Sequence, residues 1–94
     1  MNKDMVKAYI KAIQKIIIDV EEEKEKENEI RLENIRQIFN LAYYSGMSKD
    51  DEEEYFGMAE NVINEFNRNG YEHNEWLSDF FNETNSYIYN VLEK

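Results

Sequence analysis

The chain contains no proline, and its apolar residues recur every three or four positions along most of the sequence. Proline is the residue that most strongly interrupts a helix, and this apolar spacing is typical of an amphipathic helix rather than a strand. The 94 residues are enough for one domain. The sequence therefore predicts an all-α fold: a single antiparallel bundle of about four helices over residues 1–94, or three if the first two are continuous.

The expected helices lie at approximately 3–24, 29–45, 49–68 and 74–92. Gly46 suits the position that follows the second helix, and Ser48 suits the N-cap of the third. Gly57 falls inside the third helix, where glycine costs about 1 kcal/mol relative to alanine. We expect it to mark a close crossing of two helices. The fourth helix has a heptad-like apolar seam. Its members are Leu77, Phe81, Thr84, Ile88 and Val91.

Residues 21–29, EEEKEKENE, contain no apolar side chain. Two interpretations remain open: a solvated extension of the first helix, or the turn between two helices. Because a helix needs a surface on which to pack, we place the break near residues 25–28, with Asn28 as the N-cap of the second helix.

Three consecutive isoleucines widen the apolar face of the first helix to well over half of its circumference. They are Ile16, Ile17 and Ile18. A face of this width indicates a central helix of the bundle, or a second contact such as a homodimer partner.

The net charge of −10 is distributed unevenly along the chain. Residues 1–47 hold eight bases and nine acids, whereas residues 48–94 hold twelve acids and three bases. Such a surface repels phosphates, which argues against direct binding of nucleic acid. It favours a partner protein with a basic surface.

Five consecutive acids, Asp50 to Glu54, begin the third helix. Acids in a first turn complement the helix dipole, but the last two lie deeper than that effect reaches. The run is therefore either a solvated helix start or a patch that docks on a basic protein. The scarcity of bases after residue 47 favours docking, and exposed tyrosines beside acids make good interface anchors. The candidate partner-binding residues are Asp50, Asp51, Glu52, Glu53, Glu54, Glu60, Tyr44 and Tyr71.

Candidate groups for catalysis or metal binding are few. The chain has no cysteine, and His73 is the only histidine, so neither thiolate chemistry nor a histidine-based metal motif can be assembled. A calcium loop starting at Asp50 would need glycine where Tyr55 stands and glutamate where Asn61 stands. We expect no catalytic, cofactor or metal site, and a protein that is not an enzyme.

The N-terminal segment MNKDMVKAYIKAIQKIIIDV has lysines among its apolar residues. It therefore resembles neither a secretory signal nor a membrane span. Together with the absence of cysteine, this predicts a cytoplasmic protein that does not associate with membranes.

In composition, the short chain rich in Asn, Lys, Ile and Glu resembles the early proteins of phages from low-GC bacteria. It is also similar to acidic anti-CRISPR inhibitors, whose members often act as nucleic-acid mimics. The resemblance is one of composition, without a shared motif. It implies an inhibitor encoded by a phage or mobile element, whose carboxylates stand in for phosphates on a basic nucleic-acid-binding partner. The alternatives are a structural or regulatory homodimer and an immunity or antitoxin protein.

Overall fold

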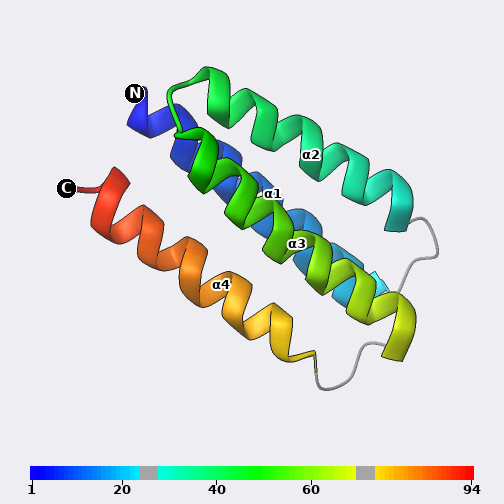
Figure 1. Cartoon of the computed structure of the whole chain (residues 1–94). Helices are drawn as coiled ribbons and strands as arrows, with labels where there is room; N and C mark the ends of the chain where they lie inside the picture. The colour runs from blue at the N-terminus through cyan, green and yellow to red at the C-terminus, as the bar shows by residue number, and fades with distance from the viewer. Residues whose placement is uncertain (24–27, 70–73) are drawn as a thin grey trace.

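The structure, a computed structural model, describes residues 1–23, 28–69 and 74–94. Its elements are α1 (Lys3–Glu23), α2 (Asn28–Tyr44), α3 (Lys49–Asn69), α4 (Glu75–Tyr87) and one turn of π-helix, η1 (Ile88–Leu92). Consecutive helices run in opposite directions (Figure 1). The predicted all-α bundle of four antiparallel helices is therefore confirmed, and α1 and α2 are separate helices.

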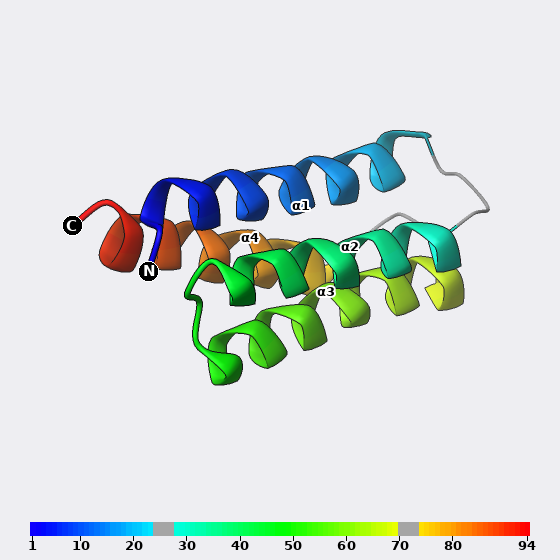
Figure 2. The same ribbon diagram turned by 90° about the horizontal axis from the view of Figure 1, so that it is seen from above.

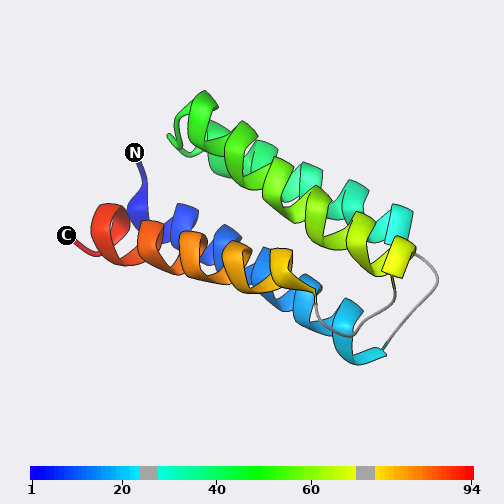
Figure 3. The same cartoon turned by 60° about the horizontal axis from the view of Figure 1, so that its bottom comes forward.

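The main contacts join each helix to the next one in the sequence: α1 to α2, α2 to α3 and α3 to α4. Figure 3 shows α3 in front of α2, and α4 in front of α1. Both ends of the chain and the α2–α3 turn lie at the same end of the bundle (Figure 2). The principal extents are 37 × 22 × 20 Å, so the molecule is a short rod.

The α2–α3 turn follows the local signals in the sequence. Gly46 has φ 110°, and its N–H donates to Tyr43 O at 3.0 Å. The N–H of Met47 donates to Ala42 O at 3.0 Å, which completes a Schellman motif. Ser48 then caps α3, because its Oγ accepts a hydrogen bond from Asp51 N at 3.1 Å.

Two asparagines tie helix starts to α3. Asn28 is buried at the start of α2, and its Nδ2 donates to Asn67 Oδ1 at 2.7 Å. Asn74 caps α4 by accepting from Leu77 N at 3.2 Å, and its Nδ2 donates to Val62 O at 3.1 Å. The predicted break at residues 25–28 lies outside the described residues except for Asn28. This residue is the first of α2 rather than its N-cap, because its Oδ1 has no hydrogen-bond partner in the described part of the chain.

The apolar core draws on all four helices and η1. Each fully buried branched or aromatic side chain contributes about 1.5–3 kcal/mol by leaving water. The buried apolar residues are Val6, Ile10, Ile13, Ile17, Val20, Ile35, Phe39, Ala42, Met47, Tyr55, Ala59, Val62, Ile63, Phe66, Phe80, Tyr87, Ile88 and Leu92.

The π turn corrects the end of the predicted seam on the fourth helix. The N–H of Glu93 donates to Ile88 O at 2.9 Å, a bond across five residues rather than four. The wider turn brings Leu92 into the core, while Val91 is 40% exposed.

The three isoleucines belong to a helix with neighbours on several sides. Ile17 is fully buried, whereas Ile16 and Ile18 are half-buried. The helix α1 contacts α2, α3 and η1, which accounts for the wide apolar face. Ile17 therefore cannot contribute to an exposed dimer face, and a homodimer through Ile16 and Ile18 stays a prediction.

Gly57 does not mark a close helix crossing, contrary to the expectation from sequence. A Cβ atom at this position would meet nothing within 4 Å. In the described part of the chain, no helix combines the length and apolarity that crossing a membrane requires.

Candidate partner-binding surface

The acidic run at the start of α3 is not a continuous patch, because a helix turns its consecutive side chains in different directions. Asp50, Glu53 and Glu54 are exposed, and Asp51 is half-buried. Glu52 is fully buried at 0% exposure, so it is not part of an exposed acidic surface. The prediction that placed Glu52 on that surface is wrong.

Glu52 is buried because it shares the core face of α3 with Tyr55 and Ala59, three and seven residues further on. Its Oε1 accepts from Lys49 Nζ at 3.2 Å, and its Oε2 has no partner among the described residues. A buried carboxylate oxygen without a partner costs free energy. The spacing of Glu52 from Tyr55 and Ala59 predicts a buried side chain, whereas its place in the first turn of a helix favours an exposed acid.

One side of α3 faces α2, and we call it the α2 flank. It carries Lys49, Glu53, Phe56 and Glu60, spaced four, three and four residues apart. Cations accompany its acids and rings. Lys49 Nζ lies 3.7 Å from Glu53 Oε1 and 5.3 Å from the centre of the Tyr43 ring.

The side chain of Arg36, in α2, adds to the positive charge on the α2 flank. The guanidinium carbon of Arg36 lies 4.5 Å above the ring of Phe56. Tyr44 also belongs to this side, where it is 82% exposed and its ring lies 5.5 Å from that of Tyr43. The predicted residues Glu53, Glu60 and Tyr44 therefore share a surface with bases.

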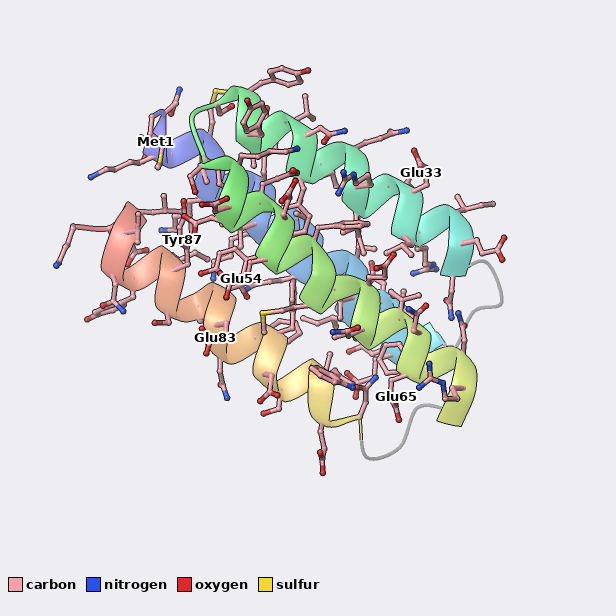
Figure 4. All side chains as sticks on the ribbon, viewed as in Figure 1. Met1, Glu33, Glu54, Glu65, Glu83 and Tyr87 are labelled. Carbon is pink, nitrogen blue, oxygen red and sulfur yellow. The ribbon has the colours of Figure 1, made fainter. Side chains whose placement is uncertain are left out.

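The other side of α3 faces α4 and holds a different arrangement. Asp51, Glu54 and Tyr55 of α3 meet Glu83 and Tyr87 of α4, and we call these five residues the α3–α4 cluster. The rings of Tyr55 and Tyr87 lie 5.4 Å apart. Figure 4 shows Glu54, Glu83 and Tyr87 gathered where α3 and α4 run side by side.

The carboxylates of the α3–α4 cluster affect the ionisation of its phenols. Burial and the negative charges of Asp51, Glu54 and Glu83 raise the pKa of Tyr55 to about 12. Burial and the charge of Asp51 also raise the pKa of Tyr87. Asp51 therefore acts on both hydroxyls.

The three carboxylates of the cluster lack a cation. Within residues 1–23, 28–69 and 74–94, none of Asp51, Glu54 and Glu83 forms an ion pair. The Tyr87 hydroxyl is buried and has no hydrogen-bond partner there either. The cluster is thus rich in hydrogen-bond acceptors and lacks positive charge.

A stripe of acids continues from the cluster along α4. Glu75, Asp79 and Glu83 are exposed and lie four residues apart. At 1.5 Å of rise per residue, successive carboxylates stand about 6 Å apart on one face. Glu75, Asp79 and Glu83 are not among the residues predicted for the site, although their regular spacing in the sequence could have identified the stripe.

The structure does not bring all predicted residues together. Tyr44 lies on the α2 side, away from the α3–α4 cluster, and Tyr71 falls outside the described residues. No group of three or more acidic or histidine side chains is arranged to hold a metal ion in the described ranges. What the acidic surface offers is attraction to cations and acceptance of hydrogen bonds.

The chain matches no protein-family model, and comparisons with curated proteins and with solved structures give no significant match. A functional proposal therefore rests on the fold and on the chemistry of this surface.

Proposed function

We propose that this protein is a small acidic binding protein that docks on a basic, nucleic-acid-binding surface of another protein and blocks it. One observation carries the proposal: two neighbouring helices expose carboxylates that have no ion-pair partner in the described chain. These carboxylates belong to Asp50, Asp51, Glu54, Glu75, Asp79 and Glu83.

The dimensions of this surface suit a groove that normally holds nucleic acid. Double-stranded DNA carries one phosphate about every 3.4 Å along the axis of each strand. The acids of α4 stand about 6 Å apart, a spacing of the same order. They line a rod 37 Å long and 20–22 Å wide. Because the acids sit on packed helices, few side chains beyond their own need to be ordered on binding.

The proposal describes a binding protein of the cytoplasm rather than an enzyme. The compositional resemblance to anti-CRISPR inhibitors adds a target class to test first, namely bacterial defence complexes that bind DNA or RNA. An antitoxin that neutralises a basic toxin would use the same electrostatics, so identification of the target separates the two.

The test is affinity capture of bound proteins with the tagged protein. The source is the fraction of a bacterial lysate that heparin retains, because heparin enriches basic nucleic-acid-binding proteins. We expect capture of a nucleic-acid-binding protein, and its release by competing DNA or RNA and by high salt. Recovery of the protein itself alone, at every salt concentration, would contradict the proposal and favour the homodimer.

Charge-reversal variants assign the capture to one surface. Replacement of Glu54, Asp79 and Glu83 by lysine should abolish capture while circular dichroism shows an intact fold. The matched control replaces Glu22, Glu29 and Glu33, three exposed acids of α1 and α2, and changes the net charge by the same amount. Equal loss in both variants would show that net charge, and not the α3–α4 surface, determines binding.

A further inference from the structure

The hydroxyl of Tyr87 is an unexplained feature of the core. Tyr87 is only 4% exposed, and its oxygen has no hydrogen-bond partner in the described part of the chain. A buried hydroxyl in this state costs about 1–3 kcal/mol, and nearly all buried polar groups avoid the cost by pairing. No described group lies within hydrogen-bond distance of this oxygen.

The unpaired hydroxyl lies beside the acids of the α3–α4 cluster. The ring of Tyr87 is 5.4 Å from that of Tyr55. Figure 4 shows exposed Glu54 of α3 and exposed Glu83 of α4 on either side of the contact between these helices, near Tyr87. Half-buried Asp51 is a third carboxylate whose charge acts on Tyr55 together with theirs. The negative charge of Asp51 also raises the pKa of both tyrosines.

The cluster is set up for a cation that the chain itself does not supply. Three like charges repel one another, and no described ion pair relieves Asp51, Glu54 or Glu83. The carboxylates are not grouped tightly enough to hold a metal ion. Metal ligands must approach within about 2.0–2.6 Å of one centre, whereas a larger organic cation can reach carboxylates that are further apart.

We propose that the α3–α4 cluster is a recognition site for one guanidinium group, the arginine side chain of a basic partner protein. This inference rests on the proposed function, because it names the contact at the centre of the same acidic surface. A guanidinium has five N–H donors in a plane, and carboxylates on two helices can accept from different edges of that plane. A further N–H can donate to Tyr87 Oη.

An ammonium group fits the cluster less well. A lysine presents three donors around a single atom and keeps its water more strongly than a guanidinium does. The ammonium group cannot donate to Glu54, Glu83 and the Tyr87 oxygen at the same time unless it loses that water. Because Tyr87 Oη has no exposed area, an arginine reaches it only when side chains rotate. Glu54 and Glu83 are free to do so, since no described ion pair holds them.

The first experiment compares two capped peptides of equal charge, hexa-arginine and hexa-lysine, by titration calorimetry against the purified protein. We expect hexa-arginine to bind on the order of tenfold more tightly. The Tyr87→Phe variant keeps all charges and should remove most of that preference without lowering the melting temperature. The control is Tyr89→Phe, which removes a hydroxyl from a side chain that is 73% exposed and should change nothing.

Nuclear magnetic resonance of tyrosine-labelled protein gives a second readout. Hexa-arginine should shift the ring signals of Tyr55 and Tyr87 more than those of exposed Tyr44. Equal affinity for the two peptides, or an arginine preference that survives Tyr87→Phe, would overturn the inference. Unchanged ring signals of Tyr55 and Tyr87 at saturation would overturn it as well.

Neutral variants separate this inference from the proposed function. The cluster variant carries Asp51→Asn, Glu54→Gln and Glu83→Gln. The matched control carries Glu22→Gln, Glu29→Gln and Glu33→Gln, so both lose three charges. We expect the cluster variant to lose at least tenfold more affinity for hexa-arginine than the control does.

Equal losses in the two variants would refute the arginine site. In that case, capture of a nucleic-acid-binding partner by the α3–α4 surface would still support the proposed function. Conversely, a clear arginine preference without any such partner would support the site and refute the proposed blocking of nucleic-acid binding.

Discussion

Both sides of α3 carry acidic residues, but the residues that surround these acids differ. On the α2 flank, Lys49 lies 3.7 Å from Glu53, and Arg36 of α2 covers Phe56. On the side that faces α4, Asp51 and Glu54 meet a third acid and two buried phenols, with no described cation. The comparison teaches that the number of acids in a segment does not locate a binding surface. The supply of cations from the neighbouring helix decides which acids are left for a partner.

Replacement of Lys49 should remove the ion pairs of the α2 flank and have the largest effect on stability. Its ammonium is half-exposed, but it is the cation that pairs with fully buried Glu52. We expect Lys49→Met to lower the free energy of unfolding by about 2 kcal/mol, because a buried carboxylate loses its partner. Urea denaturation measures this loss. In a Glu52→Leu background the same replacement should cost much less, and an equal cost would show that the pair is not coupled.

Alkaline pH should lower the stability that the α3–α4 cluster contributes to the folded protein. The pKa of Tyr55 is raised to about 12 in the folded protein, against 10.0 for a free phenol. The unfolded chain therefore releases this proton first. The stabilisation is fully present below about pH 10 and is lost as the pH rises through about 12. Urea denaturation across this range should show the decline, and Tyr55→Phe should reduce it. A slope unchanged by that replacement would contradict the assignment to Tyr55.

The unpaired hydroxyl of Tyr87 predicts a gain in stability when it is removed. Tyr87→Phe keeps the ring in the core and deletes a buried oxygen without a partner. We expect the free energy of unfolding to rise by about 1 kcal/mol. Thermal unfolding measures the change. A loss of stability would mean that the oxygen has a hydrogen-bond partner when the protein is in solution.

Gly57 lies in α3 and belongs to neither of the two surfaces. Its replacement therefore serves as a reference for a change in helix stability alone. A Cβ at this position has open space around it. Gly57→Ala should stabilise the protein by up to about 1 kcal/mol through helix propensity. The hexa-arginine affinity should remain unchanged, which a calorimetric titration of this variant checks.

The smallest effects come from two adjacent glutamates and should differ in sign. Glu53→Gln removes the more distant of the two carboxylate partners of Lys49 and should cost about 0.3 kcal/mol, whereas Glu54→Gln relieves repulsion and should add a similar amount. Paired urea denaturation curves at low salt measure the difference. High salt should abolish it. Effects of equal sign would refute the contrast between the two sides.

The sequence predicted most of the fold because helix ends are set locally. Gly46 and Ser48 act through their own backbone and hydroxyl, so the α2–α3 turn could be placed from the sequence alone. The π turn at residues 88–92 could not, because the heptad spacing of the fourth helix is equally compatible with a regular α-helix.

The candidate surface could be predicted only in part. The concentration of acids after residue 47 was visible, and Asp50, Asp51 and Glu54 do lie outside the core. Glu52 satisfied two local patterns, the first turn of a helix and the apolar spacing, and packing favoured the second. The separation of Glu53 from Glu54 depends on which helix lies on each side of α3, which is a property of the bundle rather than of the segment.

The contact between η1 and α1 has a consequence for the order of folding. The other main contacts join helices that are neighbours in sequence, so they form after closure of short loops. The contact of η1 with α1 joins the two ends of the chain and carries a larger entropic cost of closure. We expect this contact to form last and to open first. Tyr87 immediately precedes η1. The proposed arginine site therefore lies next to the part of the bundle that we expect to open most readily by local unfolding.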